Sequence, residues 1–117
     1  MRLLRDAVTR RLQRHVTRAA REVDALGDRA FTPRQLRAIR RNPDIRPMYR
    51  GNRIDVKARQ LIKNDHYLQH LESNYRRGPD FRNPRTGEWW DMTTEASWPS
   101  HVDKYGPNGI RLDTSGR

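Results

Sequence analysis

At 117 residues, the chain is long enough for one small domain, or for one domain with a helical extension. Hydrophobic residues make up 33%, which limits the core to a modest size, and no apolar run is long enough for a transmembrane helix or a signal peptide, so we expect no stable membrane insertion. The lack of cysteine excludes disulfides and thiolate zinc sites, while a net charge of +11 favours a polyanionic partner.

The positive charge is concentrated in the first half of the chain. Residues 1–63 hold 18 Lys and Arg against 6 Asp and Glu, whereas residues 64–117 hold 7 against 8. The planar guanidinium group matches phosphate oxygens, so we predict nucleic acid as the partner; a solvated basic surface is the alternative. The predicted contacts to phosphate are six arginines: Arg34, Arg37, Arg40, Arg41, Arg50 and Arg53.

Residues 2–26 are predicted to form one long helix. From Leu4 to Leu26, apolar residues recur every three or four positions, and Gly27 follows as a stop. At 1.5 Å per residue, such a rod is about 40 Å long. So narrow an apolar stripe must pack on the rest of the domain or on a partner, and its lack of Trp and Phe argues against a membrane surface.

Two shorter helices are predicted next. Thr32 is a good N-cap and Pro33 suits a first helical position, so the second helix runs from there to about Arg41. Residues 42–48 contain two prolines and are expected to form a bend, after which a third helix covers residues 52–63. Residues 1–48 are interpreted as a basic helical segment for entry, docking or substrate binding.

The second half of the chain predicts a small sheet. Residues 67–75 show both helical and strand-like spacing, residues 78–94 are typical of two strands joined by a turn, and residues 110–114 alternate as a last strand. A short helix is expected over residues 98–105. The predicted fold class is α+β, with N-terminal basic helices followed by a small mixed β-sheet with flanking helices.

Two carboxylates are expected to meet in the hairpin over residues 78–94. Asp80 lies on one arm and Asp91 on the other, with Asn83-Pro84 and Thr86-Gly87 as turn residues between them. Because a hairpin pairs its arms, both acids come within reach of one point, where a divalent cation would explain their convergence in so basic a chain. The alternative is structural, with Asp80 capping a turn and Asp91 paired with an Arg.

The hairpin resembles the core of the PD-(D/E)xK nuclease superfamily. Gly78-Pro79-Asp80, a turn and an acid on a hydrophobic second strand carry this resemblance, which covers the chain from about Tyr49 to its end, residues 49–117. The usual acid-x-Lys ending is replaced by Asp91-Met92-Thr93-Thr94. That departure is known in one similar branch, the C-terminal nuclease toxins of contact-dependent growth inhibition and other polymorphic bacterial toxin systems.

The resemblance implies a catalytic set. In that branch a Thr shortly after the second acid joins the site and the Lys comes from the following helix, which implies roles for Thr94 (or Thr93) and Lys104. The Thr would orient a water or a phosphate oxygen, and the Lys would stabilise the negative transition state. Asp80 and Asp91 would be direct ligands of Mg²⁺ or another divalent cation.

A third acid is implied on the helix before the first strand. Asp55 occupies the matching place, as an additional or water-mediated metal ligand, although the family's usual residue is Glu. The alternative for Asp55 is an ordinary ion pair with Arg59, four residues further along the helix.

The resemblance also implies a biological role. Such toxins are delivered from the cell surface into neighbouring bacteria, where they cut tRNA or DNA in the cytoplasm, and we expect tRNA. The producing cell is protected by an immunity protein, and an acidic one would suit this basic chain.

Two other functions compete with this reading. In the first, His66, His70 or His101 would serve as acid and base in a metal-independent ribonuclease. His66 and His70 would also suit zinc if they share a helix, with Asp65 or His101 as third ligand. The other possibility is a basic nucleic-acid-binding protein without catalysis.

Overall fold

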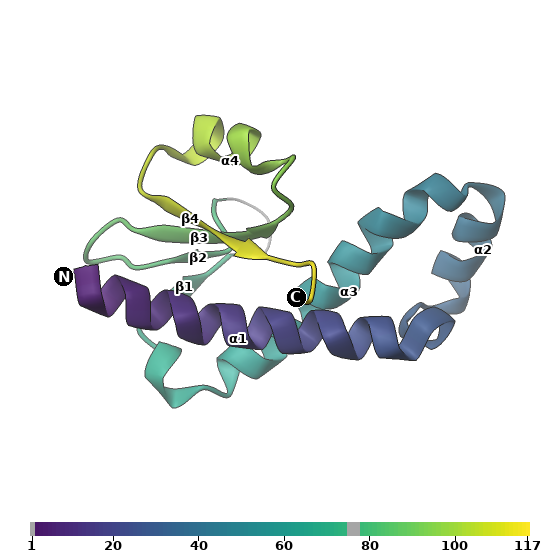
Figure 1. Ribbon diagram of the computed structural model, residues 1–117, viewed down its shortest axis with the longest axis horizontal. Coiled ribbons are helices and arrows are strands. Elements are labelled where there is room, and N and C mark those ends of the chain that lie inside the picture. Colours follow the sequence, from purple (N-terminus) through teal and green to yellow (C-terminus); the bar gives the residue numbers. More distant parts are fainter. Residues whose placement is uncertain (1, 75–77) are drawn as a thin grey trace.

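The computed structural model describes residues 2–74 and 78–117, and its long first helix runs along one side of the sheet (Figure 1). Helix α1 (Arg2–Leu26) packs against α3 (Arg46–Lys63) and against strand β4 (Gly109–Asp113). Helix α4 (Trp98–Tyr105) lies on the other side of the sheet from α1 (Figure 1). The fold is α+β, with three N-terminal helices followed by a small mixed sheet of four strands with one helix.

The first two helices have the predicted limits. α1 ends at Leu26, where Gly27 adopts a positive φ of 55° and a 3-10 turn follows (Gly27–Ala30). α2 (Pro33–Arg41) begins with a capping box, in which the Thr32 hydroxyl accepts from the Gln35 amide and the Gln35 side chain accepts from the Thr32 amide. Local sequence signals therefore determine where α1 ends and where α2 begins.

The predicted start of the third helix is wrong. α3 begins at Arg46 rather than at Asn52, and the expected bend shrinks to Asn42 and a 3-10 turn at Pro43–Ile45. Pro47 lies in the first turn of α3, where the missing N–H would have had no intrahelical partner, so this proline does not break the helix. The predicted domain boundary after residue 48 thus falls inside α3.

The sheet has the strand order β1-β2-β3-β4. β1 (Glu72–Ser73) pairs antiparallel with β2 (Phe81–Arg82), and β2 pairs antiparallel with β3 (Trp89–Thr93), as the hairpin prediction requires. After the α4 crossover, β4 returns parallel to β3, with Trp89 opposite Gly109 and Asp91 opposite Arg111. The ambiguous residues 67–75 form a 3-10 turn (His66–Leu68) and β1, while Tyr75 lies outside the described residues.

One hydrophobic core joins the first helix to the sheet. Trp90 from β3 is fully buried and its indole N–H donates to the Thr9 hydroxyl of α1 at 2.9 Å. None of the described helices is long and apolar enough to cross a membrane. The largest fully buried side chains come from α1, α3 and three strands: Leu12, Val16, Ile54, Phe81, Trp90 and Leu112.

Candidate active site

The hairpin brings Asp80 and Asp91 side by side. The Asp80 amide donates to Asp91 Oδ1 at 2.6 Å, and the Met92 amide donates to Asp80 Oδ2 at 2.8 Å. Each carboxylate is thereby fixed by the backbone of the opposite arm. Asp91 is only 3% exposed, which is unusual for an acid without a functional or structural partner.

Arg59 links this pair to the third predicted acid. Its guanidinium donates through Nη2 to Asp80 Oδ1 and through Nε to Asp55 Oδ1, both at 2.7 Å, and through Nη1 to the Ser73 hydroxyl at 2.7 Å. The Arg59 side chain is 6% exposed and lies over the ring of Phe81. The alternative pairing of Asp55 with Arg59 is therefore confirmed, and Asp55 reaches Asp80 through this cation.

His101 contacts the acid pair from α4. Its Nδ1 lies 2.5 Å from Asp91 Oδ2. In this contact Nδ1 is the donor whenever the carboxylate is ionised, since an ionised carboxylate only accepts. The ring lies against Trp98 and Tyr105, with ring centroids 6.4 and 6.5 Å away. The partner of Asp91 is thus a histidine rather than the arginine that the structural alternative expected.

Burial and charge act together on Asp80. Burial raises the pKa of Asp80 to about 6, and the charges of Asp91 and Asp55 act in the same direction, while the Met92 amide and the Arg59 guanidinium oppose the rise. Burial, more than repulsion between the acids, therefore disfavours the charged form of Asp80. A further cation beside Asp80 would favour its ionised form.

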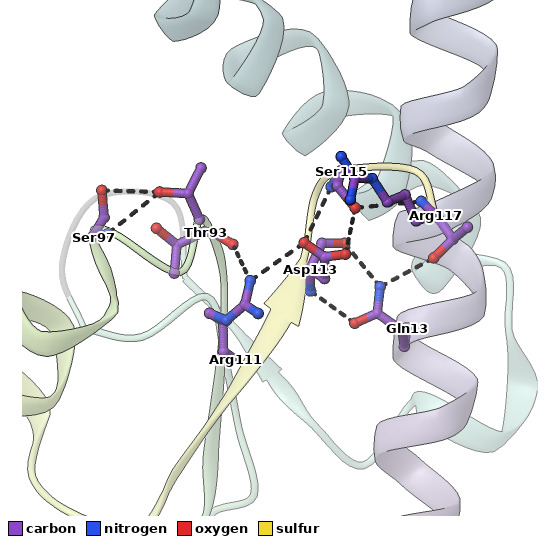
Figure 2. A network of polar contacts seen from close by, with 9 residues as sticks. Gln13, Thr93, Ser97, Arg111, Asp113, Ser115 and Arg117 are labelled. Atoms are coloured by element: carbon purple, nitrogen blue, oxygen red, sulfur yellow. Dashed lines mark hydrogen bonds and ion pairs between the residues drawn. The ribbon is translucent and has the colours of Figure 1, made fainter.

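The two predicted threonines lie at the end of β3. Thr93 is on the same face of the strand as Asp91, and its carbonyl accepts from Arg111 Nη1 at 3.3 Å (Figure 2). Thr94 lies beyond the strand, and its hydroxyl accepts from the Ser97 amide at 3.3 Å in the turn before α4. Alternation along the strand therefore favours Thr93 as the threonine nearer to the acid pair.

The predicted lysine is not in contact with these acids. Lys104 is exposed on α4, and its ammonium lies 5.2 Å from the centroid of the Tyr105 ring. Among the described residues, no ion pair joins it to Asp80 or Asp91. The positive charge in direct contact with the acid pair comes instead from Arg59.

The six arginines predicted to contact phosphate differ in exposure. Four of them are exposed on α2, and Arg53 is half-buried on α3. Arg50 donates through Nε and Nη2 to the two oxygens of Asp24 at 2.8 and 2.9 Å, which ties α3 to α1. The set that is free to meet a polyanion is centred on α2: Arg34, Arg37, Arg40 and Arg41.

The histidines considered for zinc are not arranged for it. His66 lies in a 3-10 turn and His70 in a separate turn, both exposed, so they do not share a helix face. Asp65 instead accepts from His15 Nε2 at 2.7 Å and from Arg11 Nε at 2.6 Å. That buried carboxylate fastens α1 to the turn after α3.

The acid pair suits a hard cation through two carboxylates. Within residues 2–74 and 78–117, no three His, Cys, Asp or Glu side chains are grouped to hold a metal. Mg²⁺ needs only one or two carboxylates besides water and substrate oxygens, and each carboxylate oxygen of Asp80 and Asp91 accepts one described hydrogen bond and retains a second lone pair. The donor set fits a cation held by these two acids, with Asp55 outside it.

The hollows of the described surface include one beside Arg59 and one along α1. One, of about 200 Å³, is lined by Arg59, Ser73 and Phe81 together with residues of α3 and the turn that follows it. The other is a shallow groove of about 730 Å³ along α1 whose lining includes no predicted site residue. The lining of neither hollow includes Asp80 or Asp91.

Comparison of the chain with protein-family models, with curated proteins and with solved structures found no significant match.

Sequence reasoning missed the two groups that hold the acid pair. Arg59 was visible as the partner of Asp55, but its contact with Asp80 spans 21 residues of sequence. His101 was considered as an acid or base, yet nothing in the sequence indicates that its ring faces Asp91. No local spacing would have revealed either contact, because both depend on how helices pack on the sheet.

Proposed function

We propose that this protein is a metal-dependent nuclease toxin that cleaves phosphodiester bonds, with tRNA favoured over DNA. The observation that carries the proposal is the pair of adjacent, backbone-fixed carboxylates Asp80 and Asp91. The net charge of +11 supports a polyanionic substrate. The resemblance of the hairpin to the PD-(D/E)xK superfamily supports phosphodiester cleavage over other reactions.

Asp80 and Asp91 would hold Mg²⁺ or a similar cation in this reaction. Such an ion, when bound, lowers the pKa of a bound water and offsets the charge that develops on the phosphate. Arg59 keeps Asp80 in place, and Asp55 in turn holds Arg59. We assign Thr93, on the same strand face as Asp91, to orient a water or a phosphate oxygen, and Lys104 to approach the phosphate once substrate is bound.

The arginines of α2 would bind the phosphates of the polymer away from the cut bond. Arg34 and Arg37 are exposed, as are their neighbours Arg40 and Arg41, so their forks can meet phosphate from the solvent side. Phosphate contacts give affinity without reading sequence. The choice of substrate would then depend on shape as well as on charge.

Delivery and protection follow from the same proposal. A toxin of this type would act in the cytoplasm of a target bacterium, and the producing cell would need an immunity protein. An acidic immunity protein would be attracted to this chain at long range and would compete with nucleic acid for the same basic surface.

The decisive experiment incubates the purified protein with total tRNA and with plasmid DNA, in Mg²⁺ and in EDTA. We expect metal-dependent cutting of tRNA that is lost in Asp91→Asn. Asp103→Asn removes an exposed acid from α4 and serves as the matched control, with cutting retained. Absence of cutting of both substrates, together with tight and salt-sensitive binding, would favour the non-catalytic binding protein.

One observation favours a second candidate, the metal-independent ribonuclease. The contact of 2.5 Å between Asp91 and His101 is the arrangement that orients an imidazole for proton transfer through its other nitrogen. Cutting of RNA that survives EDTA and is lost in His101→Ala would transfer the chemistry to this histidine. His66→Ala, which changes an exposed histidine, is its control.

A further inference from the structure

The side chains of His101 and Arg59 contact different members of the acid pair. Arg59 donates to Asp80 from α3, and His101 donates to Asp91 from α4. The four oxygens of the pair therefore have four different donors, two from the backbone of the hairpin and two from side chains of flanking helices. Such an arrangement leaves neither carboxylate able to rotate without breaking a hydrogen bond.

The contact between His101 and Asp91 is one of several contacts between α4 and the sheet. The rings of Trp98 and Tyr105, at the two ends of α4, lie 5.3 and 5.5 Å from the ring of the buried Trp89. These aromatic contacts fasten the helix at both ends by apolar burial.

The position of the imidazole is itself restrained. His101 is 30% exposed, and its ring is nearly parallel to that of Trp98, at an interplanar angle of 22°, and at 70° to that of Tyr105. A ring held on two sides presents its Nδ1 in one direction, toward Asp91. A hydrogen bond from a pre-positioned donor costs little side-chain entropy when it forms.

We propose that His101 is a positioning residue of the metal site, which fixes Asp91 in the orientation that binds the cation. The inference rests on the proposed function and assigns to α4 a role through this histidine, in addition to the lysine that the family resemblance implies. Hydrogen-bond partners of metal-binding carboxylates commonly contribute 10- to 100-fold, as an order of magnitude, to metal affinity.

The test measures binding of Mn²⁺ to the purified full chain by isothermal titration calorimetry, without substrate. His101→Phe keeps a ring against Trp98 and Tyr105 but removes the donor, and we expect Mn²⁺ affinity to fall by about 10-fold or more. His101→Asn places an amide N–H near the position of Nδ1, so we expect affinity within about threefold of the wild type. His66→Phe, a change at an exposed histidine, is the control and should bind as the wild type does.

Circular dichroism and thermal melting establish that each variant is folded before titration. A folded His101→Phe protein with wild-type affinity would overturn the positioning role and leave the metal site intact. If His101→Asn bound as weakly as His101→Phe, the hydrogen bond would likewise be refuted as the cause. Failure of the wild-type chain to bind Mn²⁺ would remove the proposed metal site itself, and this inference with it.

Discussion

The substitution Gly109→Ala should destabilise the fold through a single steric contact. Gly109 lies opposite Trp89 in the parallel β3–β4 pair, and an added Cβ would lie 2.1 to 2.3 Å from three atoms of the Trp89 ring. Non-bonded carbon atoms need about 3.5 Å, so the ring or the strand has to move. Trp89 is 3% exposed and packs against two other rings, which leaves it little room.

The magnitude follows from overpacking of a well-filled core. Such changes cost about 1–3 kcal/mol, and the shortness of these contacts places Gly109→Ala at the upper end, about 3 kcal/mol. The backbone of Gly109 is outside the left-handed region, so conformational strain of Ala does not contribute. For a domain of this size, we expect the melting temperature to fall by about 10 °C.

Urea denaturation followed by tryptophan fluorescence measures the change in unfolding free energy. Gly51→Ala is the matched control, because Gly51 lies within α3 and its added Cβ would meet nothing within 4 Å. The same chemical change should there stabilise the protein by up to about 1 kcal/mol, since Ala is the better helix former. In a Trp89→Phe background, where the outer carbons of the indole are absent, the cost of Gly109→Ala should shrink. Equal effects at both glycines, or an undiminished cost in that background, would refute the steric argument.

Two further predictions concern the contacts of α1. Burial tends to raise the pKa of Asp65, but its hydrogen bonds to His15, Arg11 and the Tyr67 amide lower it to about 2, below the unfolded value of 3.8. The resulting stabilisation of the folded state, about 2 kcal/mol, is present above pH 4 and is lost as the pH falls toward 2. Urea titrations between pH 2 and pH 4 should show this loss of unfolding free energy. The same pH dependence in Asp65→Asn as in the wild type would contradict the assignment to Asp65. The Gln13 side chain donates to the Asp113 carbonyl at 2.8 Å and accepts from the Asp113 amide at 2.7 Å (Figure 2). Gln13→Ala should therefore lower the free energy of unfolding by about 2 kcal/mol in the same assay. Gln60→Ala, at an exposed position, is the control and should lower it by less than about 0.5 kcal/mol.

The helices could be predicted where the deciding signal is local. The stripe of α1 and the capping box of α2 are readable in the sequence because each depends on residues three or four positions apart. The start of α3 was missed because Pro47 was interpreted as a helix breaker, whereas a proline in a first turn has no hydrogen bond to lose. Proline thus follows the end of one helix at Pro43 and lies in the first turn of the next at Pro47.

The candidate site could be predicted only as far as one hairpin extends. The approach of Asp80 and Asp91 follows from strand pairing, which acts over 11 residues of sequence. The contacts of Arg59 with Asp80 and of His101 with Asp91 depend on how α3 and α4 pack against that hairpin. Apolar residues set this packing, and their pattern does not state which polar side chain will face the acids.

The position of α1 connects the basic charge to the acid pair. Thr9 accepts a hydrogen bond from Trp90, the residue next to Asp91, and Gln13 pairs with the backbone at the end of β4, the parallel neighbour of β3. The core that buries the inner face of α1 is thus the core that supports the strand carrying Asp91. A helix whose outer face is rich in arginine and whose inner face positions β3 is part of the same folding unit as the acids. The charges that would attract a polyanion and the carboxylates that would act on it are therefore stabilised together.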